Sequence, residues 1–324
     1  MRISLGKAFR RGNYMGVYLI LVIFIIFLSV MSPSFRSGRN WSNLATRIFP
    51  LFIVGLGESF VMLTGGIDIS IGAQVSLSAA IASCIMGDSI SSIMLGIICP
   101  LIGGVLVGLL NGFVVTRFKV APFIITLGTM VLLQGLTFQI RWMPGGYISK
   151  EFADVVLYRL GILPLGPLVS LIIFGFLAIV ILGKTPIGRN IYAVGGNEEA
   201  ARLAGVNTSR VKIFAYVLCS LFCALAGLYE GARMQCADPH VGDPFLMDGI
   251  MVATLGGTSL FGGQGSPIGV IGGAIFIASL GNMFNLLDFN TFTQYIIKGF
   301  VLVSCILLSH LQVSRRTEIS RRQV

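Results

Sequence analysis

Long apolar segments, separated by short polar connections, recur along nearly the whole chain. At about 1.5 Å of helix rise per residue, a segment of roughly 20 apolar residues crosses a bilayer. The pattern therefore predicts an all-α, polytopic transmembrane helical bundle of about ten spans. The predicted spans cover residues 14–31, 48–63, 71–86, 92–115, 122–139, 168–182, 213–229, 246–260, 268–284 and 291–311.

The first apolar segment, residues 14–31, has two interpretations. A cleaved secretory signal also begins with basic residues followed by an apolar run. This run is long for a signal, however, and no small-x-small cleavage site follows it. We therefore expect a retained first helix, within one transmembrane domain covering residues 14–312.

Composition supports a membrane protein, because 55% of the residues are hydrophobic and only 11% are charged. The net charge of +10 is also compatible with nucleic-acid binding. Most Lys and Arg residues nevertheless lie at the ends of apolar spans, where they set topology, so we expect no nucleic-acid partner. The positive-inside rule places the tails, 1–13 and 313–324, in the cytoplasm together with the 117–119 link and the 184–212 loop.

The 184–212 loop is too polar for a bilayer core, and its residues predict a short, capped helix. Asn197 is a suitable N-cap, and Glu198 and Glu199 would place negative charge in the first turn, where it favours the helix dipole. Gly205 can adopt the left-handed conformation that ends a helix. Asn207 can cap the helix that follows.

Two charged residues inside predicted spans, Glu58 and Lys298, are the main intramembrane candidates. A lone charge at mid-helix costs roughly 2.5–3.5 kcal/mol on insertion scales, so neither should face lipid. They pair with each other or snorkel toward an interface, or else one of them lines a polar pathway. Asp68 lies where paired glycines interrupt the helix, and Gly108 belongs to a small-residue stripe, Gly104–Gly108–Gly112, that favours close helix packing.

The sequence indicates no catalytic or metal site. The GKT at 183–185 resembles the end of a phosphate loop, but position 178 is Ala instead of the required glycine and no strand precedes it. No Ser/His/Asp arrangement is present, and the two histidines, His240 and His310, lie far apart. The six cysteines show no metal-binding spacing. We therefore expect a protein that is not an enzyme.

Four sequence blocks resemble the permeases of ATP-binding-cassette (ABC) importers, and specifically the ribose-type permeases of the carbohydrate uptake class two group. The E-A-A-x-x-x-G signature of such permeases matches Glu199 to Gly205. The same block includes the adjoining PIGRNIYAVGGN (186–197). The other three blocks are GGIDISIG (65–72), NG with PFIITLG (111–112 and 122–128) and LGGTSLFGG (255–263), and all four occur in the order typical of the family. The resemblance marks Arg189, Asn197, Glu198, Glu199, Ala200, Ala201, Arg202 and Gly205 as the segment that docks on an ATPase.

This resemblance implies a complete importer in the bacterial plasma (inner) membrane. Two permeases, either two copies of the chain or a copy and a paralogue, would form the pathway for the substrate. A separate cytoplasmic ATPase would bind ATP and Mg²⁺, so this chain would hold no cofactor. An extracytoplasmic binding protein would deliver a monosaccharide or a related small polyol or furanosyl compound.

Five residues are the candidates for the substrate pathway: Asp68, Asn111, Phe123, Thr126 and Gln134. Sugar sites combine aromatic faces with a few amides, although Phe123 could equally pack and the amides could join helices.

A gradient-driven secondary transporter is the alternative, with Glu58, Asp68 and Lys298 as its coupling relay. A membrane assembly subunit is a third possibility, and the 184–212 loop could be a solvated connector.

Overall fold

The computed structural model describes the backbone of residues 14–321 and the side chains of 15–307. The described residues form helices joined by short connections and contain two isolated β-bridges but no strand. The elements are α2 (Tyr14–Met31), η1 (Pro33–Arg36), α3 (Gly38–Leu63), α4 (Ile71–Ile85), α5 (Ile90–Phe118), α6 (Pro122–Ile140), α7 (Lys150–Val156), α8 (Leu165–Lys184), α9 (Pro186–Gly196), α10 (Glu198–Leu203), α11 (Thr208–Met234), α12 (Asp243–Leu255), α13 (Pro267–Leu286) and α14 (Thr291–Arg321).

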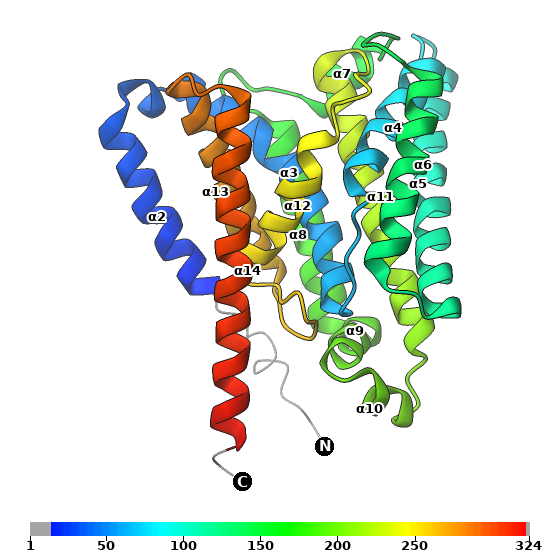
Figure 1. The fold of residues 1–324 in the computed structure, drawn as a ribbon. Helices are drawn as coiled ribbons and strands as arrows, with labels where there is room; N and C mark the ends of the chain where they lie inside the picture. The colour runs from blue at the N-terminus through cyan, green and yellow to red at the C-terminus, as the bar shows by residue number, and fades with distance from the viewer. Residues whose placement is uncertain (1–13, 322–324) are drawn as a thin grey trace.

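Six of the described helices are long and apolar enough to cross a membrane, namely α3, α5, α6, α8, α11 and α13. Shorter apolar helices occur within α2, α4 and α14. The long helices run side by side, with α9 and α10 at one end of the bundle and α7 at the other (Figure 1). The all-helical membrane class predicted from the sequence is therefore confirmed.

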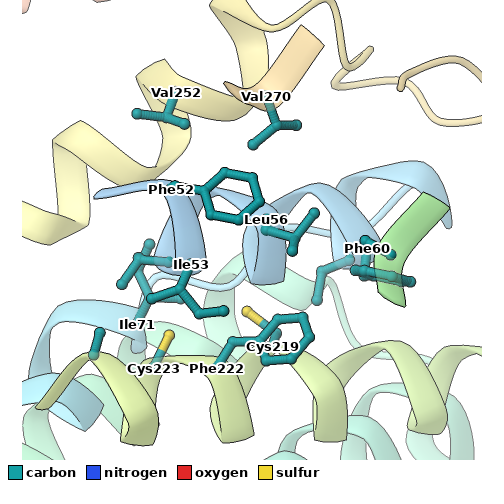
Figure 2. Close-up of a cluster of buried hydrophobic side chains, with 14 of the residues drawn as sticks. Phe52, Ile53, Leu56, Phe60, Ile71, Cys219, Phe222, Cys223, Val252 and Val270 are labelled. Atoms are coloured by element: carbon teal, nitrogen blue, oxygen red, sulfur yellow. The ribbon is translucent and has the colours of Figure 1, made fainter. Parts of the chain in front are cut away.

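Helix α11 lies at the centre of the bundle and packs against α3, α4 and α5. The glycine stripe of α5 packs closely, as predicted, and its partner is α11, since a Cβ on Gly108 would lie 2.5 Å from the Cα of Val217. Figure 2 shows the core around α3, where Phe52 lies on the side that faces Val252 of α12 and Val270 of α13, and Phe222 of α11 lies on the opposite side of α3. Burial of its side chains against α11, α12 and α13 thus holds α3 in the interior of the bundle.

Residues 32–47, expected to be a polar connection between the first two predicted spans, are mostly helical, so that expectation is wrong. They form η1 and the first turns of α3. The Ser37 side chain caps α3 by accepting from the backbone N–H of Asn40 at 3.2 Å. Phe35 and Leu44 are fully buried, and this burial stabilises a helix whose composition is polar.

The predicted tails are only partly described. Residues 1–13 and 322–324 lie outside the described residues. Helix α14 continues through the predicted boundary at 312 to Arg321, so most of the 313–324 segment is helical.

Candidate functional site

The 184–212 segment contains two helices, where the sequence predicted one. The unpredicted helix is α9, which has Pro186 at its first position. The Thr185 hydroxyl caps it by accepting from the N–H of Gly188 at 3.2 Å. Proline is favoured at the first position of a helix because its missing N–H has no partner there. The Thr-Pro pair was therefore a readable signal for a helix start.

Helix α10 forms where it was predicted. The Asn197 Oδ1 accepts from the backbone N–H of Ala200 at 2.9 Å, and Gly205 ends the helix with φ +85°. The Asn207 Oδ1 caps α11 by accepting from the N–H of Arg210 at 3.0 Å. Both caps and the left-handed glycine are confirmed, because each depends only on neighbouring residues.

The outer surface of α10 is charged. Arg202 Nη2 lies 2.6 Å from Glu199 Oε1, and both side chains are about two-thirds exposed, at 66% and 63%. The hydrogen bond from Arg202 lowers the pKa of Glu199, and the same bond raises the pKa of Arg202. Lys212 Nζ lies 2.5 Å from Glu198 Oε2 and ties α10 to α11. The Glu199–Arg202 pair thus lies within α10 itself, whereas the Lys212–Glu198 pair links this exposed short helix to α11.

Two apolar residues of α10 face opposite ways. Leu203 is 79% exposed, whereas Ala201 is 5% exposed and packs into the core of this chain. Ala200 and Arg189 are exposed. Leu203 was absent from the residues predicted for this segment, and its exposure at the tip makes it the apolar contact available to a partner.

Two of the predicted pathway residues, Asp68 and Asn111, belong to one buried hydrogen-bond network. Asp68 Oδ1 accepts from the Ser70 N–H at 2.9 Å and the Ser70 hydroxyl at 2.5 Å. Asn111 Nδ2 donates to Asp68 Oδ2 at 3.3 Å. The Thr129 hydroxyl donates to Asn111 Oδ1 at 2.6 Å. Thr129 was missed, although it lies three residues after Thr126 on the same helix face.

The other three pathway candidates do not join this network. Phe123 is half exposed on the outside of α6, and Gln134 is half buried. The Thr126 hydroxyl donates to the carbonyl oxygen of Pro122 in its own helix at 3.0 Å. A cavity of about 550 Å³ lies near Arg159, at the end of the bundle that carries α7, and none of the five candidates lines it. The structure therefore brings together two of the five residues.

The predicted alternative of a Glu58–Lys298 pair is wrong. Lys298 Nζ lies 2.8 Å from Asp248 Oδ1 and donates to Asp248 Oδ2 at 2.8 Å, joining α14 to α12. Glu58 is fully buried, and its Oε1 accepts from the backbone N–H of Asp68 at 3.2 Å. Asp248 was overlooked, although an acidic residue inside an apolar span signals a buried partner. Among the described residues, no group of His, Cys, Asp and Glu could hold a metal ion.

Comparison with known proteins identifies relatives over almost the whole chain. Residues 40–306 match the family described as branched-chain amino acid transport system, permease component. The ribose import permease protein RbsC of Bacillus subtilis is 38% identical over 300 residues, which cover 91% of this chain and 92% of that protein. RbsC of Escherichia coli K12 is 35% identical, covering 90% of this chain and 91% of the relative.

A second group of relatives carries a different sugar in its name. The galactose/methyl galactoside import permease protein MglC of Escherichia coli K12 is 30% identical over 321 residues, covering 93% of this chain and 95% of that protein. A search of solved structures found no significant match.

Proposed function

This chain belongs to the family of branched-chain amino acid transport system permease components, and from that premise we propose how it works within an importer. It is a permease subunit of an ABC sugar importer, a transport protein and not an enzyme, and it resides in the bacterial inner membrane. The 38% identity over 91% of the chain to a ribose import permease carries this conclusion.

We propose that the chain crosses the membrane about ten times, with both termini in the cytoplasm. The shorter apolar helices within α2, α4 and α14 add to the six long ones, and α12 would be the tenth crossing. The end of α14 lies at the same end of the bundle as α9 and α10 (Figure 1). Charge supports this orientation, because Lys184, Arg189, Arg202, Arg210 and Lys212 gather at that end, and basic residues favour the cytoplasmic side.

The partner of α10 would be a separate cytoplasmic ATPase that binds ATP and Mg²⁺. Support comes from the exposed surface of α10, where Leu203 is flanked by the charged pair of Glu199 and Arg202. A short helix with an apolar tip and a polar rim has the anatomy of a docking element. Two permeases, either two copies or a copy and a paralogue, and an extracytoplasmic sugar-binding protein would complete the importer.

The substrate would be a monosaccharide or a related small polyol or furanosyl compound. Relatives named for ribose are 35–38% identical to this chain, and the first relative named for galactose is 30% identical. Ribose is therefore the first sugar to test. The substrate passes between permeases, so we propose that the network of Asp68 and Asn111 shapes the pathway from within the chain.

The gradient-driven alternative loses its relay. Lys298 bonds to Asp248, whereas Glu58 bonds to the backbone of Asp68, so these bonds do not link the three proposed relay residues into one chain. The buried pair of Glu58 and Asp68 remains a local contact at the helix break.

Reconstitution tests the proposed function. The tagged chain would be purified gently from its native membrane, its co-purifying ATPase and binding protein identified, and the complex placed in proteoliposomes. We expect uptake of radiolabelled ribose, with galactose as the comparison sugar, that requires ATP and the binding protein and survives collapse of ion gradients. Uptake that needs an ion gradient and no ATP would refute the ABC assignment, whereas a chain that neither transports nor recruits an ATPase would indicate an assembly subunit.

A further inference from the structure

The inner face of α9 meets two interrupted stretches of the bundle at one point. The first is the end of α3, where Leu63 is followed by the non-helical residues 64–70 that lead to α4. The second is the connection 256–266 between α12 and α13. The two stretches are joined directly, since the N–H of Gly263 donates to the carbonyl oxygen of Leu63 at 3.0 Å. Figure 1 shows α9 next to the ends of both stretches.

Gly195 packs backbone to backbone against this point. A Cβ placed on Gly195 would lie 1.8 Å from the carbonyl oxygen of Leu63 and 2.5 Å from the nitrogen of Gly263. In the reverse direction, a Cβ on Gly262 would lie 2.7 Å from the carbonyl oxygen of Gly195. Gly262 has φ +88°, a conformation that ordinary L-residues avoid. Contacts between backbones have no flexible side chain that could absorb a displacement, so they are stiff.

A hydrogen bond one turn earlier fixes the same helix face. The Tyr192 hydroxyl donates to the carbonyl oxygen of Gly265 at 2.9 Å. Burial raises the pKa of Tyr192 to about 12, so the hydroxyl keeps its proton and remains a donor at neutral pH. Tyr192 and Gly195 are three residues apart and therefore share a helix face. Helix α9 is thus attached at two points to the connection between α12 and α13.

The attached stretches lead directly to the buried polar groups of the membrane interior. Leu63 ends the helix that carries Glu58, and residues 64–70 contain Asp68, which bonds to Asn111. The connection 256–266 follows α12, which carries the Asp248 that pairs with Lys298. The glycine contacts at the end of α9 therefore lie between α10 and two buried polar groups, the Asp68–Asn111 network and the Asp248–Lys298 pair.

We propose that Gly195, with Leu63, Gly262 and Gly263, forms a backbone joint that transmits movement of α10 to both interrupted stretches during transport. This inference rests on the proposed function, because it assumes that an ATPase moves α10. Gly195 and Tyr192 are accordingly positioning residues, which act through the ends of α3 and α12 without touching substrate.

Adjacent glycines provide a matched test. Gly195→Ala inserts a methyl group against two backbones, whereas a Cβ on Gly196 would meet nothing within 4 Å. In proteoliposomes with the ATPase and the binding protein, we expect Gly195→Ala to reduce ribose uptake per ATP hydrolysed at least tenfold. The amount of Gly195→Ala protein in the membrane and its co-purification with the ATPase should equal those of the wild type. Gly196→Ala should match the wild type in every measurement. An unchanged ratio of uptake to ATP in Gly195→Ala would overturn the joint, as would equal losses in both variants.

If Gly195→Ala does not insert into the membrane, a less disruptive variant tests the proposal. Tyr192→Phe removes only the hydroxyl that bonds to Gly265, and we expect a severalfold lower ratio of uptake to ATP at a normal membrane level. A wild-type ratio in Tyr192→Phe would then refute the proposal. Absence of ATP-driven uptake in the wild-type complex would instead refute the proposed function, so the two failures are distinguishable.

Discussion

Charged side chains occur in two contrasting settings, the interior of the bundle and the surface of α10. In the interior, Asp248 and Lys298 pair with side chains only 8% and 12% exposed. On α10, Glu199 and Arg202 pair with side chains 63% and 66% exposed. A buried pair has no water to replace a lost partner, whereas an exposed pair does. The interior charges therefore hold helices together, and the charges on α10 remain available to another protein.

The largest effect should come from breaking the buried pair. Lys298→Met leaves the Asp248 carboxylate without its partner, and losing one member of a buried pair costs about 3–5 kcal/mol. We expect a marked loss of thermal stability for the purified chain in detergent. The double variant Asp248→Leu with Lys298→Met should recover most of it, because the uncompensated charge is gone. A single variant as stable as the wild type would show that the pair contributes little.

Gly205→Glu should abolish ATPase docking while membrane insertion stays intact. The left-handed conformation at Gly205 costs an ordinary L-residue about 1–2 kcal/mol, and a negative charge is unfavourable at the C-terminal end of a helix. Co-purification of the ATPase measures docking. Gly205→Asn is the control, since Asn tolerates this conformation and adds no charge. Wild-type transport by Gly205→Glu would remove α10 from the docking role.

Leu203→Asp should weaken docking without disturbing the bundle. Burying a leucine side chain contributes about 1.5–3 kcal/mol, so its loss corresponds to an affinity roughly 10- to 100-fold lower. Titration of the solubilised chain with the ATPase measures this affinity. Leu203→Met, which keeps an apolar side chain of similar volume, should bind nearly as the wild type does. Equal affinities for the aspartate and methionine variants would mean that the exposed leucine contacts no partner.

The smallest effect should be the pH response of the exposed pair. Arg202 lowers the pKa of Glu199, so the contribution of this pair to α10 is complete above the ordinary glutamate pKa. That contribution disappears as the pH falls through the lowered pKa of the folded state. Carbon-13 NMR of the Glu199 carboxylate, titrated in nanodiscs, should give a higher midpoint in Arg202→Gln. The same midpoint in both proteins would contradict the assigned cause.

Local features of the 184–212 segment were predictable because their chemistry involves neighbouring residues. Asn197 caps a helix through the N–H three residues later, and Gly205 needs only its own backbone freedom. Helix α9 was missed although its Thr185–Pro186 start was readable. The first turns of α3 were missed for another reason, since their stabilisation comes from burying Leu44 within the bundle.

The partners of the buried charges could not be predicted. A pair of Lys298 with Glu58 was one alternative, on the ground that both charges are costly in a membrane, but Lys298 bonds to Asp248, 50 residues away. A composition argument shows that a buried charge needs a partner without showing which helix supplies it. The choice depends on the rotation of α12 and α14 about their axes, which side-chain packing sets.

The sequence by itself determined the all-helical membrane class and the capped α10, because long apolar runs and capping residues act within a few turns of helix. Four motif blocks in order also indicated the permease family that the relatives confirm. Only the tertiary structure decided that a Cβ on Gly195 would collide with Leu63 and Gly263, whereas a Cβ on Gly196 would meet nothing within 4 Å. Adjacent glycines are identical in sequence terms, and their difference arises because packed helices place one toward the core and the other toward solvent.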